Sequence, residues 1–100
     1  MTELHSEQYN DLLYQGNEMV LFFYREKEAE SVLQRDVLKE IDRLVPRSFE
    51  IYPVNADAET LLTELFSVKN TPEVIVLKDK KIWKRSQGLT DYLNLTRMIL

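Results

Sequence analysis

A cluster of five charged residues is the part of this sequence whose types and spacing could do chemistry. It consists of Arg25, Glu26, Lys27, Glu28 and Glu30. Two carboxylates held together can act as general acid and general base, as in many hydrolases. Carboxylates at the start of a helix instead stabilise it through the helix dipole, by about 0.3–1 kcal/mol each. The adjacent cations favour the second interpretation, so we expect no catalytic residue here.

Thiol and metal chemistry are limited by composition. The chain has no cysteine, which excludes disulfides, thiolate nucleophiles and cysteine metal sites. It has one histidine, His5, so a zinc site would need mainly carboxylate ligands, which is unusual. His5 lies in a segment, residues 1–5, that we expect to be loose, and we expect it to be neither ligand nor base. No metal and no cofactor are expected.

A second charged cluster surrounds a predicted hairpin and contains five cations: Lys78, Lys80, Lys81, Lys84 and Arg85. A charged edge strand that discourages unwanted strand pairing is the favoured interpretation, and a patch for an anion or a partner is the alternative. Ile82 and Trp83 alternate between these cations, so they should point to opposite faces. We expect one to pack under a helix and the other to be partly exposed, where Trp83 would suit an interface.

The overall composition is that of a globular domain, so we expect residues 1–100 to form a single one. Hydrophobic residues make up 44% and charged residues 30% of the chain. The longest apolar run, residues 19–24, is too short to span a membrane, and the N-terminus lacks the pattern of a signal peptide. A cytoplasmic protein that does not bind membranes is expected. The net charge of −4 argues against a nucleic-acid partner.

Periodic apolar residues predict the elements of the first half. Residues 6–15 favour a short helix, capped by Ser6 and ended by Gly16, with an apolar face of Tyr9, Leu12 and Leu13. Residues 19–24 are typical of a strand buried on both faces. A longer helix follows and ends near Val45, before Pro46, with an apolar stripe that contains Leu33, Val37, Leu38, Ile41 and Leu44. Residues 49–54 alternate as a strand does.

The second half predicts a helix, a hairpin and a final helix. Asp57 can cap the first of these helices, whose apolar residues are Leu61, Leu62, Leu65 and Phe66, and Thr90 can cap the last. The strands and the last helix are expected at residues 74–77, 81–86 and 91–100, with a tight turn at 79–80. A strand–helix–strand unit followed by a hairpin predicts an α/β fold, in which a mixed sheet is covered by helices on both faces.

Three motifs in this order resemble the thioredoxin-like family. They are the apolar run at 19–24, the sequence Val54-Asn55-Ala56-Asp57, and the Val68-Lys69-Asn70-Thr71-Pro72 loop, which is followed by a hairpin and Gly88. The resemblance covers residues 6–100 and implies a thioredoxin-like fold, with about four strands flanked by four helices. The family's N-terminal edge strand is missing.

The resemblance also implies that the family's redox residues are absent. The Cys-x-x-Cys motif falls on Glu28-Ala29-Glu30-Ser31, and the tryptophan before it becomes Lys27. The family's buried acid and its lysine neighbour align with Phe22 and Pro53. Nucleophile, resolving thiol and proton relay are thus all lost, which indicates a redox-inactive member.

The proline loop is retained, and the resemblance implies that it contacts a partner. In the family this proline is cis and the residue before it offers backbone hydrogen bonds to an extended peptide; the alternative is that Pro72 only shapes the loop. We expect a contact surface for another protein or peptide formed by Lys27, Glu28, Ala29, Glu30, Ser31, Thr71, Pro72, Glu73, Gly88 and Leu89. The expected function is that of a protein-binding, adaptor or chaperone-like module.

Two other function classes stay open from the sequence. One is an enzyme that uses carboxylates or an unrecognised cofactor at the same surface. The other is a structural subunit or a homodimer that uses the sheet edge left bare by the missing N-terminal strand.

Overall fold

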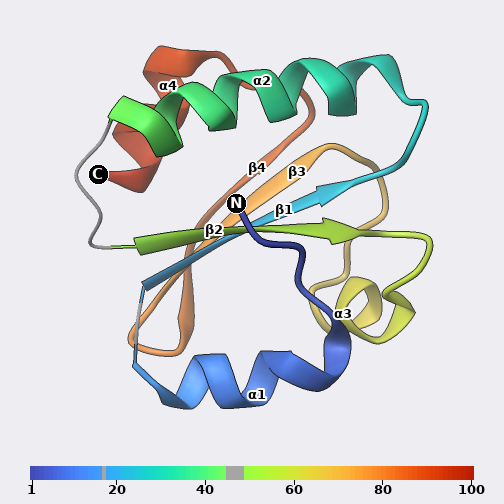
Figure 1. The fold of residues 1–100 in the computed structure, drawn as a ribbon, viewed down its shortest axis with the longest axis vertical. Coiled ribbons are helices and arrows are strands. Elements are labelled where there is room, and N and C mark those ends of the chain that lie inside the picture. Colours follow the sequence, from blue (N-terminus) through green and yellow to red (C-terminus); the bar gives the residue numbers. More distant parts are fainter. Residues whose placement is uncertain (17, 45–48) are drawn as a thin grey trace.

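The sheet of this protein confirms the predicted α/β architecture. A computed structural model describes residues 1–16, 18–44 and 49–100. Within these residues, four strands are arranged in the order β2-β1-β3-β4 (Figure 1). Their bounds are β1 Glu18–Tyr24, β2 Phe49–Asn55, β3 Glu73–Lys78 and β4 Lys81–Gln87. β1 pairs in parallel with β2 and antiparallel with β3, and β3 pairs antiparallel with β4, so the sheet is mixed as expected.

Four helices in the described residues cover both faces of the sheet (Figure 1). They are α1 Ser6–Tyr14, α2 Ala29–Leu44, α3 Thr60–Leu65 and α4 Tyr92–Ile99. Helices α1 and α3 pack on one face, and α2 and α4 on the other. β1 is buried on both sides, because its successive side chains alternate between these two cores. None of the described helices is long and apolar enough to cross a bilayer.

Three predicted helix caps are wrong, those of α1, α3 and α4. His5 rather than Ser6 is the cap residue of α1, and its N–H donates to Gln8 Oε1 at 3.2 Å. α3 begins at Thr60, later than expected from Asp57, because the Asn55 side chain accepts the N–H groups of residues 57 and 58 and holds a turn there. These are corrections of one to three residues, and they leave the element order unchanged.

The cap of α4 is Asp91 rather than Thr90. The Oδ1 atom of Asp91 accepts the N–H of Asn94 at 2.9 Å, which satisfies a donor of the first turn. The hydroxyl of Thr90 is engaged elsewhere, by the hydroxyl of Ser86, and the side chain of Gln34 binds the backbone N–H and carbonyl of Thr90. Asp91 therefore supplies the side chain that caps the first turn.

The predicted apolar stripes are only partly buried. In α2, Leu38 and Ile41 are buried, but Leu33 and Leu44 are exposed. At α3 and the residue that follows it, Leu62 and Phe66 are buried, whereas Leu61 and Leu65 are exposed. Each helix therefore presents a narrower face to the sheet than its sequence pattern indicated. The predicted helix end at Val45 and Pro46 lies outside the described residues.

The hairpin of β3 and β4 forms as predicted, but its apolar side chains differ from expectation. Asp79 and Lys80 have φ angles of 52° and 65°, which suit a two-residue hairpin turn. The register shifts between Val76 and Leu77, so Trp83 has no residue directly opposite in β3. Ile82 and Trp83 are both exposed, Trp83 at 56%, and the expectation that one packs under a helix is wrong.

The N-terminal segment is ordered, so the prediction that residues 1–5 are loose is wrong. Leu4 is fully buried among core residues, and its N–H donates to the carbonyl of Pro53 at 2.9 Å. Pro53 lies in β2, the edge strand, and has no N–H of its own to offer. The segment thus covers part of the edge that we expected to be bare, which weakens the basis for a homodimer built on it.

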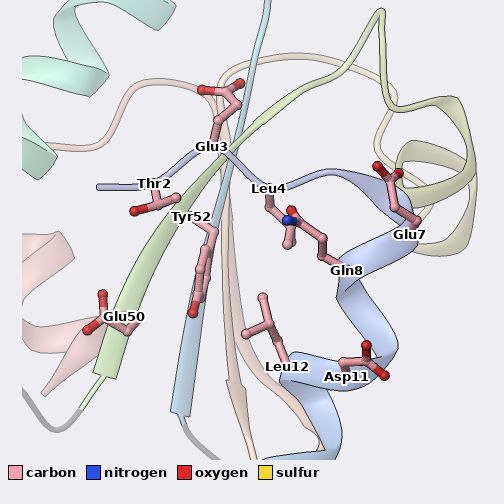
Figure 2. Close-up of a pocket in the computed structure, with 9 residues that line it drawn as sticks. All are labelled: Thr2, Glu3, Leu4, Glu7, Gln8, Asp11, Leu12, Glu50 and Tyr52. Atoms are coloured by element: carbon pink, nitrogen blue, oxygen red, sulfur yellow. The ribbon is translucent and has the colours of Figure 1, made fainter.

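The same segment forms one wall of a groove of about 430 Å³ (Figure 2). Leu4 and Leu12 lie opposite Tyr52 of β2 in this view. Four carboxylates line the groove: Glu3, Glu7, Asp11 and Glu50. Glu3 also accepts a hydrogen bond from the hydroxyl of Tyr24, and burial together with this contact raises the pKa of Tyr24 to about 12.

His5 and Glu59 form an ion pair that should make stability depend on pH. His5 Nδ1 lies 2.9 Å from Glu59 Oε2, and Glu59 Oε1 accepts the N–H of Ser6 at 2.9 Å. The hydrogen bond to Glu59 raises the pKa of His5 above 6.5, and the hydrogen bond to His5 lowers the pKa of Glu59 below 4.5. The histidine contribution is complete below pH 6.5 and is lost as pH rises through the raised pKa. The glutamate contribution is complete above pH 4.5 and is lost as pH falls.

The difference in Tm between the wild type and His5→Gln is therefore expected to be largest between pH 4.5 and 6.5. Glutamine keeps a polar side chain but cannot carry the charge. Thermal unfolding followed by circular dichroism from pH 3.5 to 9 measures the difference. A difference that stays constant over this range would contradict the pairing.

Candidate functional site

The predicted contact surface is assembled around the carboxylate of Glu28. Its Oε1 atom accepts the hydroxyl hydrogens of Ser31 at 2.5 Å and of Thr71 at 2.7 Å. Thr71 precedes Pro72, and the peptide bond between them is cis. The fold therefore brings positions 28 and 31, at the start of α2, against the proline loop that enters β3.

Arg25 closes this network from the end of β1. Its Nη1 donates to Thr71 Oγ1 at 3.2 Å, and its backbone N–H donates to Ser31 Oγ at 3.2 Å. Its Nε pairs with Asp57 Oδ1 at 3.0 Å. The carboxylate of Glu28 is thus engaged by two hydroxyls that are themselves held by Arg25. This arrangement ties together the end of β1, the start of α2 and the proline loop.

The ten predicted surface residues differ in accessibility. Four are exposed: Lys27, Ala29, Glu30 and Leu89. Glu28 and Gly88 are half-buried. The remaining four are buried: Ser31, Thr71, Pro72 and Glu73. The accessible side chains of this surface are therefore mainly those next to the start of α2, together with Leu89.

Glu73 points into the protein rather than toward a partner. It is 1% exposed, and its Oε2 atom accepts from Arg85 Nε at 2.5 Å. Arg85 also donates to the carbonyl of Phe66 at 2.8 Å, whereas Glu73 Oε1 has no partner among the described residues. The sequence indicated surface roles for both residues. The sequence held no signal for this pair, because a hairpin with a two-residue turn and no bulge would put residues 73 and 85 on opposite faces. The register shift between Val76 and Leu77 brings them diagonally onto one face.

The floor of the site is apolar. Phe22, at the position where the resemblance placed a buried acid, is fully buried among hydrophobic residues of the α2 and α4 face. The guanidinium of Arg35 lies over the rings of Phe22 and Tyr24, at 5.5 and 4.5 Å from their centroids. A small hollow of about 240 Å³ beside them carries both signs of charge, from Arg25, Glu26, Lys27 and Arg35.

The last two features of this surface are its potential metal ligands and the glycine beside the proline loop. No group of three His, Asp or Glu side chains within them is placed to hold a metal ion. Gly88 N–H donates to the carbonyl of Pro72 at 2.8 Å, so the glycine lies directly beside the proline loop as the sequence predicted.

The backbone is similar to solved thioredoxin structures. A mutant thioredoxin from Halobacterium salinarum NRC-1 matches with a TM-score of 0.86 over 99% of this chain and 86% of that chain, at 14% identity. A second match is a structure solved to explain the thiol resolving mechanism in yeast mitochondrial 1-Cys peroxiredoxin via glutathione/thioredoxin systems. Its TM-score is 0.89 over 99% of this chain and 92% of that chain, at 18% identity.

A third solved structure also matches, whereas the sequence comparisons give no match. Thioredoxin-2, a component of malaria parasite protein secretion machinery, matches with a TM-score of 0.77 over 82% of this chain and 80% of that chain, at 22% identity. No family model matches the chain, and no curated protein sequence matches it. The fold is therefore thioredoxin-like, as the sequence predicted.

Proposed function

We propose that this chain is a redox-inactive, thioredoxin-like module that binds another protein, in the manner of an adaptor or a chaperone. Thiol–disulfide exchange needs a thiolate to attack a sulfur and a second thiol to release the mixed disulfide. The chain has no cysteine, and positions 28 and 31 carry a carboxylate and a hydroxyl. Its own side chains therefore cannot carry out this reaction.

The observation that carries the proposal is the hydrogen bond between Thr71 and Glu28. It connects the proline loop to the start of α2 by side chains that have no redox use. Within the described residues, no backbone hydrogen bond engages the N–H or carbonyl of Thr71. A retained, rigid loop with free backbone groups supports the binding of an extended peptide, whose own backbone can pair with it.

The proposal is tested by capturing partners from native lysate with a variant that alters only the exposed rim. Ala29→Arg with Glu30→Lys adds bulk and reverses charge at the start of α2, where both residues are exposed. We expect the amount of specifically captured protein to fall at least about tenfold, because added bulk and a reversed charge at an interface together cost more than the roughly 1.4 kcal/mol that a tenfold loss of affinity requires.

The matched control is Asn10→Arg with Glu64→Lys, which makes the same change of net charge on α1 and α3 at exposed positions. These helices cover the opposite face of the sheet (Figure 1). Equal capture by the wild type and both variants would overturn the proposed function at this surface.

A further inference from the structure

An apolar groove of about 510 Å³ lies between α2 and the segment that leads into α4. Its apolar walls are Leu33 and Val37 from α2, and Leu89 and Tyr92 from the opposite side. Leu33, Leu89 and Tyr92 are 52%, 44% and 41% exposed. Single exposed leucines are ordinary on protein surfaces, but a group that lines one groove is typical of an interaction site.

The two walls of this α2/α4 groove are fixed relative to each other. Gln34, on α2, is fully buried, and its amide makes two hydrogen bonds to the backbone of Thr90. The distances are 2.8 Å from the Thr90 N–H to Oε1 and 3.1 Å from Nε2 to the Thr90 carbonyl. A preformed groove loses little conformational entropy when it is filled, so its apolar area is available to drive binding.

The charges around the groove indicate the charge of a segment that would fit it. Asp36 and Asp91 line it, and no lysine or arginine of the described chain does so. Glu30, exposed at the start of the same helix, adds a further negative charge on α2. An apolar segment flanked by cations complements this surface, whereas an acidic segment would be repelled.

The backbone of the groove walls determines the form of the partner. α2 satisfies its backbone groups internally, and on the opposite wall the backbone N–H and carbonyl of Thr90 are both bound by Gln34, so neither wall is a strand edge that an extended peptide could join. An amphipathic helix that inserts side chains is the known mode of binding for such a surface. The groove also adjoins the proline loop, because Leu89 follows Gly88, which is hydrogen-bonded to Pro72.

We propose that the α2/α4 groove holds the apolar face of a basic amphipathic helix from the partner protein. The inference rests on the proposed function and names the chemistry of what is bound. Leucine-type side chains would pack against Leu33 and Tyr92, and lysine or arginine side chains would pair with Asp36 and Asp91. The groove is thereby a second contact region, beside the proline loop and continuous with it through Leu89.

The test measures fluorescence anisotropy with a labelled, amidated 14-residue peptide of leucine and lysine in an amphipathic helical pattern. A peptide with glutamate in place of lysine, and one of the same composition without the pattern, are the control ligands. We expect Leu33→Ser with Leu89→Ser to weaken binding of the leucine–lysine peptide at least about tenfold, and Asp36→Lys to weaken it about threefold. Leu61→Ser, which changes an exposed leucine on α3 outside the groove, should leave the Kd unchanged.

Three outcomes would overturn the proposal. The glutamate peptide could bind as tightly as the lysine peptide, or the groove variants could bind like the wild type. Binding could also be lost only in Glu7→Lys with Asp11→Lys, which would place the peptide in the carboxylate-lined groove near the N-terminus. If any of these occurs while partner capture still depends on residues 29 and 30, the proposed function stands and only this inference fails.

Discussion

Arg85→Ala is expected to lower the free energy of unfolding by about 3 kcal/mol, because it leaves the carboxylate of Glu73 buried without a cation. Glu73 is 1% exposed, and its contacts to Arg85 are the side-chain partners found for it in the described residues. The same substitution also leaves the carbonyl of Phe66 without the donor that Arg85 supplies at 2.8 Å. Urea denaturation at pH 7 measures the loss.

The matched control is Lys84→Ala, which removes a neighbouring cation from the same strand. Lys84 is exposed and lies over the ring of Trp83, so its loss should change stability by less than about 0.5 kcal/mol. Replacing both members of this pair, by Glu73→Gln with Arg85→Ala, should recover a large part of the loss, because the buried charge of Glu73 is gone. Equal stability of Arg85→Ala and Lys84→Ala would show that the pair of Glu73 and Arg85 contributes nothing.

This pair also marks a limit of reasoning from sequence. Periodicity and turn residues located the strands and helices of the described residues, because those signals are local: the apolar run of β1 and the Asp79–Lys80 turn need no distant partner. Arg85 stood among lysines and looked like one more solvated cation. Only the packing of β4 beside β3 reveals that its side chain reaches a buried acid, twelve residues away in the chain.

The candidate site shows the same division between local and long-range information. Spacing and resemblance indicated that positions 28 and 31 meet Pro72, and the structure brings them together. The hydrogen bond from Thr71 to Glu28 spans 43 positions and could not be inferred from either segment alone. It joins the carboxylate of Glu28, at the start of the α2 region, to the residue that precedes Pro72.

Helix caps were the least predictable local feature. Ser6 and Thr90 are good capping residues by type, yet the hydroxyl of each is engaged elsewhere: that of Ser6 by Glu59, and that of Thr90 by Ser86. The caps then fall on the neighbouring residues His5 and Asp91. A tertiary contact outweighs a capping preference because a single cap contributes only about 1 kcal/mol.

Leu4→Ala is expected to lower the free energy of unfolding by about 2–5 kcal/mol, the range for a leucine removed from a packed core. Leu4 is fully buried and belongs to the core between the sheet and the α1 and α3 helices. Leu4→Met conserves volume and should cost less than about 1.5 kcal/mol, while Thr2→Ala, at an exposed neighbouring position, should have almost no effect. Chemical denaturation of the three variants measures these differences.

The Leu4 result also bears on how this fold replaces a missing strand. The Leu4 N–H bonds to Pro53 on the outer edge of β2, so the N-terminal segment and a proline together leave that edge few free donors for another chain. If Leu4→Ala and Thr2→Ala proved equally stable, the segment would contribute nothing to the core, and the edge of β2 would be as open to pairing as the sequence first indicated. A large loss in Leu4→Ala alone would instead make the first residues an integral part of the fold.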